Sequence, residues 1–224
     1  MLKSFSNVES HYLGLIDFDK ALGLQYQYHA KVSASNQSEK KSYILGLEHP
    51  TVMTLGLRAH KLEVSSFCAK PWPHPVHRIS RGGLATIHNP GQLVIYPIVD
   101  LKEQGLSVKG FVQVLFEATL KTLNELKISS TMDLCDQPGV YTSQGKIAFC
   151  GLQIKNSITL HGLSINIAND VSVFNDIQSC GVSTPKIDSV LNQGVVYSPR
   201  DFFNVWLKHF NLTSAITLSN IACS

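Results

Sequence analysis

The sequence predicts an α+β fold in which a mixed β-sheet is flanked by helices. Residues 139–167 contain three β-rich runs in succession, whereas the longest helical pattern, at residues 108–126, places its apolar residues on one face. Strands that come in runs, with helices segregated between them, are typical of this fold class. We expect a single domain over residues 1–224, because no shift in composition marks a boundary before about residue 185.

The N-terminal half is expected to hold one helix and several short strands. In chain order we expect a helix at residues 15–30, a polar loop at 33–38, strands at Ser42–Glu48 and Thr51–Leu57, an irregular connection at Lys70–His77, and strands at Val76–Ser80 and Leu93–Val99. Pro97 lies inside the last of these strands. Because proline has no backbone N–H, it predicts an edge strand or a bulge at this point.

The C-terminal half begins with the strongest helical pattern and ends with another. The elements expected are a helix at Val108–Leu126, strands at Gly139–Thr142, Lys146–Ile154 and Ile158–Ile167, and a helix at Arg200–Phe210. Ser198 and Pro199 precede the last helix. Serine is a favoured N-cap and proline a favoured first helical residue, so the helix is expected to start there.

Composition excludes several classes of protein. The net charge is only +3, charged residues make up 16% of the chain, and no Lys/Arg cluster exceeds two residues, so we expect no nucleic-acid partner. No secretory signal and no apolar run of membrane-spanning length are visible, which predicts a cytoplasmic location without membrane contact. Five cysteines without a C-x-x-C pair argue against a disulfide framework or a structural zinc site.

One segment concentrates residues that favour ligand binding. It runs from Arg81 to Gln92 (RGGLATIHNPGQ) and contains three glycines, an arginine and a histidine. Glycine lets the backbone approach a ligand closely, arginine offers a fixed fork of donors, and histidine exchanges protons near neutral pH. A turn between strands with a solvated arginine explains this segment equally well.

Three further side chains are candidates for chemistry. Cys180 precedes a glycine, and such a thiol becomes nucleophilic when a base or cation lies nearby. Lys146 enters an otherwise apolar strand, where partial burial lowers the pKa of an amine. His161 interrupts another apolar strand, and alternation places it on the face of Leu163 and Ile165. Each also has a structural reading: a buried thiol, a solvated lysine and a hydrogen-bonded core histidine.

Taken together, the ordered motifs resemble the lipoyl(octanoyl) transferases, which transfer octanoyl groups from acyl carrier protein to proteins. The resemblance covers residues 45–185 and rests on the blocks Arg81–Leu93, Pro138–Tyr141, Gly145–Gly151, His161–Asn166 and Ser179–Gly181. It implies the fold of the biotin protein ligase and lipoate ligase catalytic domain. It also implies octanoyl-acyl carrier protein as donor, and as acceptors the lipoyl domains of 2-oxoacid dehydrogenases and glycine cleavage protein H.

The resemblance assigns roles to individual residues. Cys180 would form the acyl thioester, and Lys146 would be its partner. The residues implied to bind the acyl substrate are Arg81, Gly82, Gly83, Leu84, Ala85, Thr86, Ile87, His88, Phe149, Cys150, Gly151, His161, Gly162, Leu163 and Ser164. His88 and His161 would orient groups rather than act as the base. No metal is implied, and no cofactor beyond the phosphopantetheine that carries the acyl group.

Departures and alternatives complete the prediction. The family pattern differs from this chain at Ser80, Ile87, Asn89, Ser164 and Ser179, which concern the acyl pocket and the shape of its loops.

One alternative is an ATP-dependent lipoate-protein ligase, which does not require the cysteine. A second uses Cys150 as nucleophile, and a third is a non-catalytic module that binds acyl carrier protein or lipoyl domains.

Overall fold

The computed structural model describes residues 7–35, 41–59, 71–176 and 186–213. Its main sheet has seven strands in the order β1-β2-β6-β10-β9-β8-β7. Their bounds are β1 Val8–Leu15, β2 Ser42–Glu48, β6 Gln92–Ile98, β10 Ile158–Asn166, β9 Lys146–Lys155, β8 Gly139–Tyr141 and β7 Thr131–Asp133. The β1–β2 pair is parallel and the others are antiparallel, so the predicted mixed sheet is confirmed.

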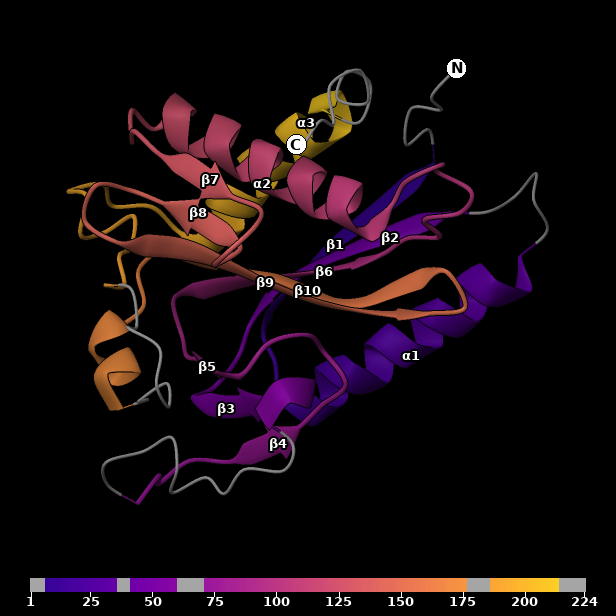
Figure 1. The fold of residues 1–224 in the computed structure, drawn as a ribbon, viewed down its shortest axis with the longest axis horizontal. Helices are drawn as coiled ribbons and strands as arrows, with labels where there is room; N and C mark the ends of the chain where they lie inside the picture. Colours follow the sequence, from indigo (N-terminus) through magenta and orange to yellow (C-terminus); the bar gives the residue numbers. More distant parts are fainter. Residues whose placement is uncertain (1–6, 36–40, 60–70, 177–185, 214–224) are drawn as a thin grey trace.

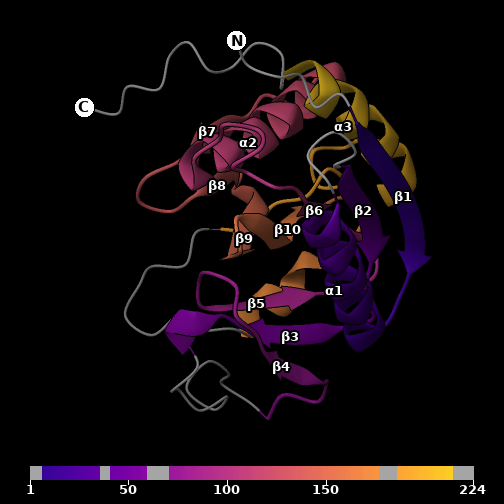
Figure 2. The ribbon, with the colours of Figure 1, turned by 90° about the vertical axis from the view of Figure 1, so that its right-hand side faces the viewer.

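Helices cover both faces of this sheet. Helices α2 (Val108–Glu125) and α3 (Pro199–Thr213) lie on one face, and α1 (Phe18–Ala34) lies on the other (Figure 1). A second sheet of three strands, β4 (Val76–Arg78), β3 (Val52–Leu55) and β5 (Ala85–His88), lies on the α1 side (Figure 2). The α+β prediction is therefore confirmed, and the glycine-rich segment Arg81–Gln92 runs through β5 of the second sheet to the start of β6 in the main sheet.

Helix starts follow from local hydrogen bonds. Ser198 accepts the N–H of Asp201 at 3.0 Å, which confirms it as the cap of α3. Ser107 accepts the N–H of Gly110 at 3.1 Å in front of α2, and Asp17 accepts that of Asp19 at 3.0 Å in front of α1. Each cap satisfies an N–H group that has no partner inside its helix.

Packing against the sheet produces two apolar clusters. The larger, between the sheet and helices α2 and α3, includes Phe111, Phe116, Phe203 and Trp206, all almost fully buried. The Trp206 indole donates to Thr119 Oγ1 at 3.0 Å, so its polar atom is satisfied within the core. Burial of such large rings supplies much of the free energy that stabilises a fold.

Some expected elements need correction. Helix α1 spans Phe18–Ala34 rather than 15–30, and Thr51–Leu57 contains a shorter strand followed by the 3-10 turn Leu57–Ala59. Strands β1, β5 and β7 were not expected. The half-exposed β1 presents no apolar run, and the other two have only four and three residues.

The prediction that Pro97 marks an edge strand is wrong. Strand β6 lies between β2 and β10, with Pro97 paired to Ile44 of β2. On its other side β6 pairs with β10, and the continuous pairing of these two strands ends at Leu163 and Ile95, before it reaches Pro97. There His161 has a φ of 56° and donates its backbone N–H to Oε1 of Gln25 at 2.7 Å. The Gln25 side chain of α1 thus accepts the His161 N–H in place of a partner from β6.

Candidate active site

Arg81 is buried, and its guanidinium forms hydrogen bonds to backbone oxygens and to Thr54. Its guanidinium donates to the backbone oxygens of Thr54 at 2.7 Å, Gly82 at 2.8 Å and Leu84 at 2.9 Å. Burial lowers the pKa of Arg81 to about 10, which leaves it charged at neutral pH. The arginine therefore fixes the conformation of its own loop and links β3 to the segment that precedes β5.

The glycines of this loop allow it to lie directly on β9. Gly82 donates its N–H to the Leu152 oxygen at 3.1 Å. A Cβ on Gly151 would lie 3.1 Å from the Gly82 oxygen, and a Cβ on Gly56 would lie 2.5 Å from the Gly83 oxygen. These close approaches account for glycine at positions 56 and 151, whereas a Cβ on Gly82 would lie 3.7 Å from the Leu152 oxygen, an ordinary contact.

A bulge in β9 sets the direction of Lys146. Between Val140 and Tyr141 of β8 the pairing with β9 shifts by one residue. Ile147 and Ala148 both pack in the larger apolar cluster, although neighbours in a regular strand face opposite sides. The shift puts Lys146 on the same side as Phe149, and its Nζ lies 5.1 Å from the centre of that ring.

Within the part of the chain that the structure describes, Lys146 is surrounded by carbonyl acceptors and forms no ion pair. Its Nζ donates to the oxygen of Pro138 at 2.8 Å and to that of Gln137 at 3.3 Å. A Cβ on Gly139 would lie 2.3 Å from Cε of Lys146, so only glycine leaves room for this side chain. Burial lowers the pKa of Lys146 to about 8, although the Asp133 carboxylate opposes the shift. The amine therefore exchanges its proton close to neutral pH.

Cys150 does not have the environment of a nucleophile. It packs against the larger apolar cluster, on the side of β9 away from Phe149. Burial of the thiol raises its pKa to about 12, although the residue keeps some exposed surface. Since the thiolate is the reactive form, this neutral thiol disfavours the alternative that uses Cys150.

His88 belongs to a chain of amides that fixes its protonation. Asn166 donates to the backbone oxygen of Asp188 at 2.9 Å, so its Oδ1 is free to accept from Gln92 Nε2 at 2.9 Å. Gln92 Oε1 then faces Nδ1 of His88 at 2.6 Å, which makes Nδ1 the protonated nitrogen. Burial lowers the pKa of His88 to about 3. The ring is neutral, and it is a weak base.

The last predicted segment departs from regular alternation at its first residue. The His161 ring centroid lies 6.5 Å from that of Tyr96, whose side chain packs in the cluster facing α1. Leu163 packs in the cluster on the opposite face, so the expected common face with His161 is wrong. A Cβ on Gly162 would lie 2.1 Å from the Ile95 oxygen. Ser164 is buried and pairs with Phe149 of β9.

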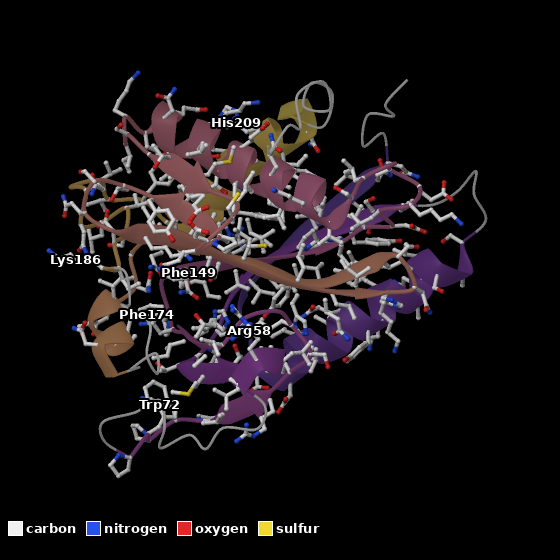
Figure 3. All side chains as sticks on the ribbon, viewed as in Figure 1. Arg58, Trp72, Phe149, Phe174, Lys186 and His209 are labelled. Atoms are coloured by element: carbon white, nitrogen blue, oxygen red, sulfur yellow. The ribbon has the colours of Figure 1, made fainter. Side chains whose placement is uncertain are left out.

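Several of the remaining residues that were predicted to bind the substrate pack in an apolar cluster of the second sheet. Ile87 is buried with Met53 and Leu55, and Leu84, Ala85 and Phe174 pack against them. Phe174 comes from the 3-10 helix η3 (Val171–Asp176), and its ring stacks on Phe149 at 5.6 Å between centroids (Figure 3). The structure thus brings the Arg81–His88 segment, Lys146 and Phe149–Gly151 to one region. Cys180 lies outside the described residues.

Several residues near the site were not selected from the sequence. Gln25, Tyr96 and Tyr141 are examples, and the first of these lies far from every motif in the sequence. Asn89, a departure from the family pattern, donates to the Asp170 oxygen at 2.8 Å and accepts from Asn169 at 3.0 Å. Of these residues, Tyr141 could have been found from the sequence, because it belongs to the motif Pro138–Tyr141 and is aromatic.

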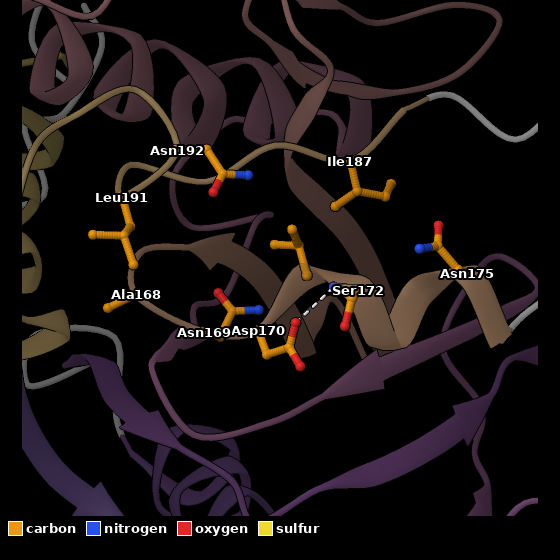
Figure 4. Close-up of a pocket in the computed structure, with 9 residues that line it drawn as sticks. Ala168, Asn169, Asp170, Ser172, Asn175, Ile187, Leu191 and Asn192 are labelled. Carbon is orange, nitrogen blue, oxygen red and sulfur yellow. Dashed lines mark hydrogen bonds between the residues drawn. The ribbon is translucent and has the colours of Figure 1, made fainter.

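A separate hollow of about 550 Å³ opens between η3 and residues 187–192 (Figure 4). The residues that line it are Ala168, Asn169, Asp170, Val171, Ser172, Asn175, Ile187, Leu191 and Asn192. The Asp170 carboxylate accepts the N–H of Ser172 at 2.9 Å beside it. It contains none of the predicted site residues, but Ile187 in its wall pairs with Lys146 through the backbone.

Neither a metal cluster nor a membrane-spanning helix is found in the described part of the chain. No group of three His, Cys, Asp or Glu side chains in these ranges is placed to hold a metal ion. None of the helices described there has the length and apolar character needed to cross a bilayer.

Comparisons with known proteins find relatives of this chain. Residues 17–211 match the family model of the lipoyl protein ligase A/B catalytic domain. The chain is 33% identical to an octanoyltransferase of Geotalea uraniireducens, over 80% of this chain and 79% of that protein. It is 35% identical to an octanoyltransferase of Chromobacterium violaceum, over 82% of this chain and 84% of that protein.

Solved structures resemble the fold at lower identity. The bi-partite lipoate protein ligase of Thermoplasma acidophilum superposes with a TM-score of 0.68 at 14% identity, covering 97% of this chain and 88% of that one. Biotin protein ligase of Aquifex aeolicus gives a TM-score of 0.50 at 11% identity, covering 94% and 70%. At such identities the likeness establishes the fold alone.

Proposed function

Because this chain belongs to the lipoyl protein ligase A/B catalytic-domain family, with octanoyltransferases among its relatives, we propose that it transfers octanoyl groups to lysines of lipoyl domains. The donor in this proposal is octanoyl-acyl carrier protein, and the acyl group passes through a thioester on Cys180. No nucleotide, metal or other cofactor takes part. A cytoplasmic location and the named acceptor proteins belong to the same proposal.

The environment of Lys146 is the observation that carries the proposal. Its amine is buried, burial lowers its pKa to about 8, and it faces carbonyl oxygens rather than a carboxylate of the described residues. A lysine that only stabilised the fold would gain more from an ion pair. One that can donate or accept a proton near neutral pH suits acid–base catalysis.

Both ends of the segment that contains Cys180 are anchored near Lys146. At its start, Phe174 of η3 stacks on Phe149, whose ring faces the Lys146 amine. At its end, Lys186 accepts the backbone N–H of Lys146 at 2.7 Å. Cys180 is six residues from each anchor, a reach of about 20 Å for an extended chain. This connectivity permits the thiol to approach the amine.

The proposed reaction has two acyl transfers. Lys146 accepts the Cys180 proton, and the thiolate attacks the thioester carbonyl of the donor. The carrier thiolate leaves and takes the proton back from Lys146, so an octanoyl-Cys180 thioester and a neutral Lys146 remain. The amine of the acceptor lysine then attacks this thioester and loses a proton to Lys146. The Cys180 thiolate leaves and takes that proton, which restores the thiol. The product is an amide.

The acyl chain would lie along the apolar wall formed by Leu84, Ala85, Ile87 and Phe174. Burying about six methylene groups of the octanoyl chain would contribute roughly 5 kcal/mol to binding. Arg81 is not available to hold the phosphates of a nucleotide, because its donors are directed at backbone oxygens and at Thr54. This disfavours the ATP-dependent alternative.

The test is the intact mass of the protein after mixing with octanoyl-acyl carrier protein in the absence of ATP. We expect wild type and Cys150→Ala to gain one octanoyl group that hydroxylamine removes, and Cys180→Ala to gain none. A lipoyl domain added next should take over the group. Modification of that domain only when ATP and free octanoate are supplied would replace the transferase with a ligase. A complex with no acyl product would indicate a binding module.

A further inference from the structure

Two aromatic rings enclose the Lys146 amine. The centre of the Tyr141 ring on β8 lies 5.3 Å from Nζ, and that of Phe149 on β9 lies 5.1 Å away. Both distances are within the range in which the negative face of a ring attracts a cation. We call these two rings the aromatic clamp.

Each ring is itself held in position by an independent contact. The Tyr141 hydroxyl donates to the Gln137 oxygen at 2.6 Å, the same oxygen that accepts from Lys146 at 3.3 Å. The Phe149 ring stacks on Phe174 with an interplanar angle of 5°. Both rings are therefore held by contacts other than the one with the lysine, although Tyr141 and Lys146 share the Gln137 oxygen.

We propose that the aromatic clamp of Tyr141 and Phe149 stabilises the charged form of Lys146 and thereby sets the pH range in which the lysine exchanges its proton. The two residues are positioning residues, because they act through Lys146. Burial alone favours the neutral amine. The rings oppose this without bonding to the nitrogen, so one N–H remains for Cys180 or the acceptor amine beside the two carbonyl contacts.

Four other charged or titratable residues lie around Lys146. The Asp133 carboxylate on β7 and the Cys150 thiol on β9 each favour the ammonium form. Lys186 and Asp188 contact Lys146 through their backbones, and the Asp188 side chain accepts from Thr142 and Gln193. Replacing Tyr141 removes none of these groups, and Tyr141→Phe separates the loss of the hydroxyl bond to Gln137 from the loss of the ring. A shift in the titration of Lys146 in such a variant therefore reports the ring.

The test follows the titration of Lys146 by NMR in the full chain with isotope-labelled lysine, assigned by the loss of its signal in Lys146→Arg. Tyr141→Leu removes the ring and should lower the pKa of Lys146 by about half a unit to one unit. Tyr141→Phe keeps the ring and should titrate close to wild type. Phe149→Leu should shift in the same direction, which gives an independent answer if Tyr141→Leu fails to fold.

Tyr26→Leu is the matched control. Tyr26 is an exposed ring on α1 that lies 5.8 Å from Nζ of Lys155, remote from the motifs of the site, and its loss should leave the Lys146 titration unchanged. The proposal is overturned if Lys146 titrates at or above its wild-type pH in Tyr141→Leu, as it would if the ring served only to exclude water. Equal shifts in Tyr141→Phe and Tyr141→Leu would also overturn it.

The effect on rate rests on the proposed function, whereas the titration does not. In the octanoyl-transfer assay, the pH profile of Tyr141→Leu should shift by the same amount and in the same direction as the Lys146 signal. A shift of the signal without a shift of the profile supports the clamp and argues against a catalytic Lys146. The two proposals therefore fail separately.

Discussion

The hydroxyl of Tyr96 lies 2.8 Å from Nε2 of His49, and both groups are buried between the two sheets. Nδ1 of the same ring lies 2.7 Å from the Ile16 oxygen and must therefore be protonated. It follows that Tyr96 donates to His49, whose ring is neutral. His88 lies beside it, with ring centroids 5.7 Å apart. Neutral histidines thus form part of the layer that joins the sheets.

The buried neutral histidines predict that the fold loses stability in weak acid. Burial lowers the pKa from 6.5 to about 4 for His49, about 3 for His88 and about 4 for His161. Below pH 6.5 the unfolded chain binds these protons and the folded chain does not, so the free energy of unfolding falls as pH drops toward 4. Each histidine should contribute a loss of about 1.4 kcal/mol per pH unit.

Urea denaturation between pH 6.5 and pH 4 measures this slope. In His49→Gln the slope should be smaller by the share of one histidine, since glutamine also donates to one group and accepts from another. Contributions from carboxylates are common to both proteins and cancel in the difference. Identical slopes for the variant and wild type would show that His49 is not responsible.

Arg81→Lys tests whether the arginine is structural. A single ammonium cannot reach the oxygens of Thr54, Gly82 and Leu84 together, so buried acceptors would be left unpaired. We expect the free energy of unfolding to fall by about 2–4 kcal/mol. Arg78→Lys is the control, because Arg78 is exposed and should lose less than about 1 kcal/mol. An unchanged stability with a raised KM for the acyl donor would instead identify Arg81 as a ligand-binding group.

The same elements show what could be predicted from sequence. Helices α2 and α3 carry strong periodicity and caps, and β2 (Ser42–Glu48) has the predicted bounds. The central position of Pro97 could not be predicted, because the compensating bond joins His161 to Gln25, 136 residues away in sequence. Motifs identified Lys146, but the direction of its side chain depends on a bulge that arises from pairing with β8. Contacts between distant segments are thus the missing information.

Lys146→Met tests the proposed acid–base role. Methionine has a similar length and removes the cost of burying an amine, but it leaves the Pro138 oxygen without its donor, so the free energy of unfolding should change by less than about 2 kcal/mol. The rate of octanoyl transfer should fall by about 10²–10⁴-fold, as for loss of a positioned acid–base group. Lys155→Met, at the exposed end of the same strand, should keep the wild-type rate. A Lys146→Met enzyme that retained full activity would exclude the role.

Gly139→Ala separates the position of Lys146 from its chemistry. The new Cβ would lie 2.3 Å from Cε of Lys146 and 2.8 Å from the Ala148 oxygen, so the lysine chain must move. We expect a loss of transfer activity of at least about tenfold, since a displacement of about 1 Å is costly in catalysis. The thermal midpoint should fall as well, because the backbone oxygen cannot move as freely as the lysine.

Gly23→Ala is the matched control: its Cβ meets nothing within 4 Å in helix α1, so it should raise stability by about 1 kcal/mol and leave activity unchanged. If Gly139→Ala lost stability but retained the wild-type rate per folded molecule, then the close packing of Gly139 against Lys146 would serve the fold and not the reaction.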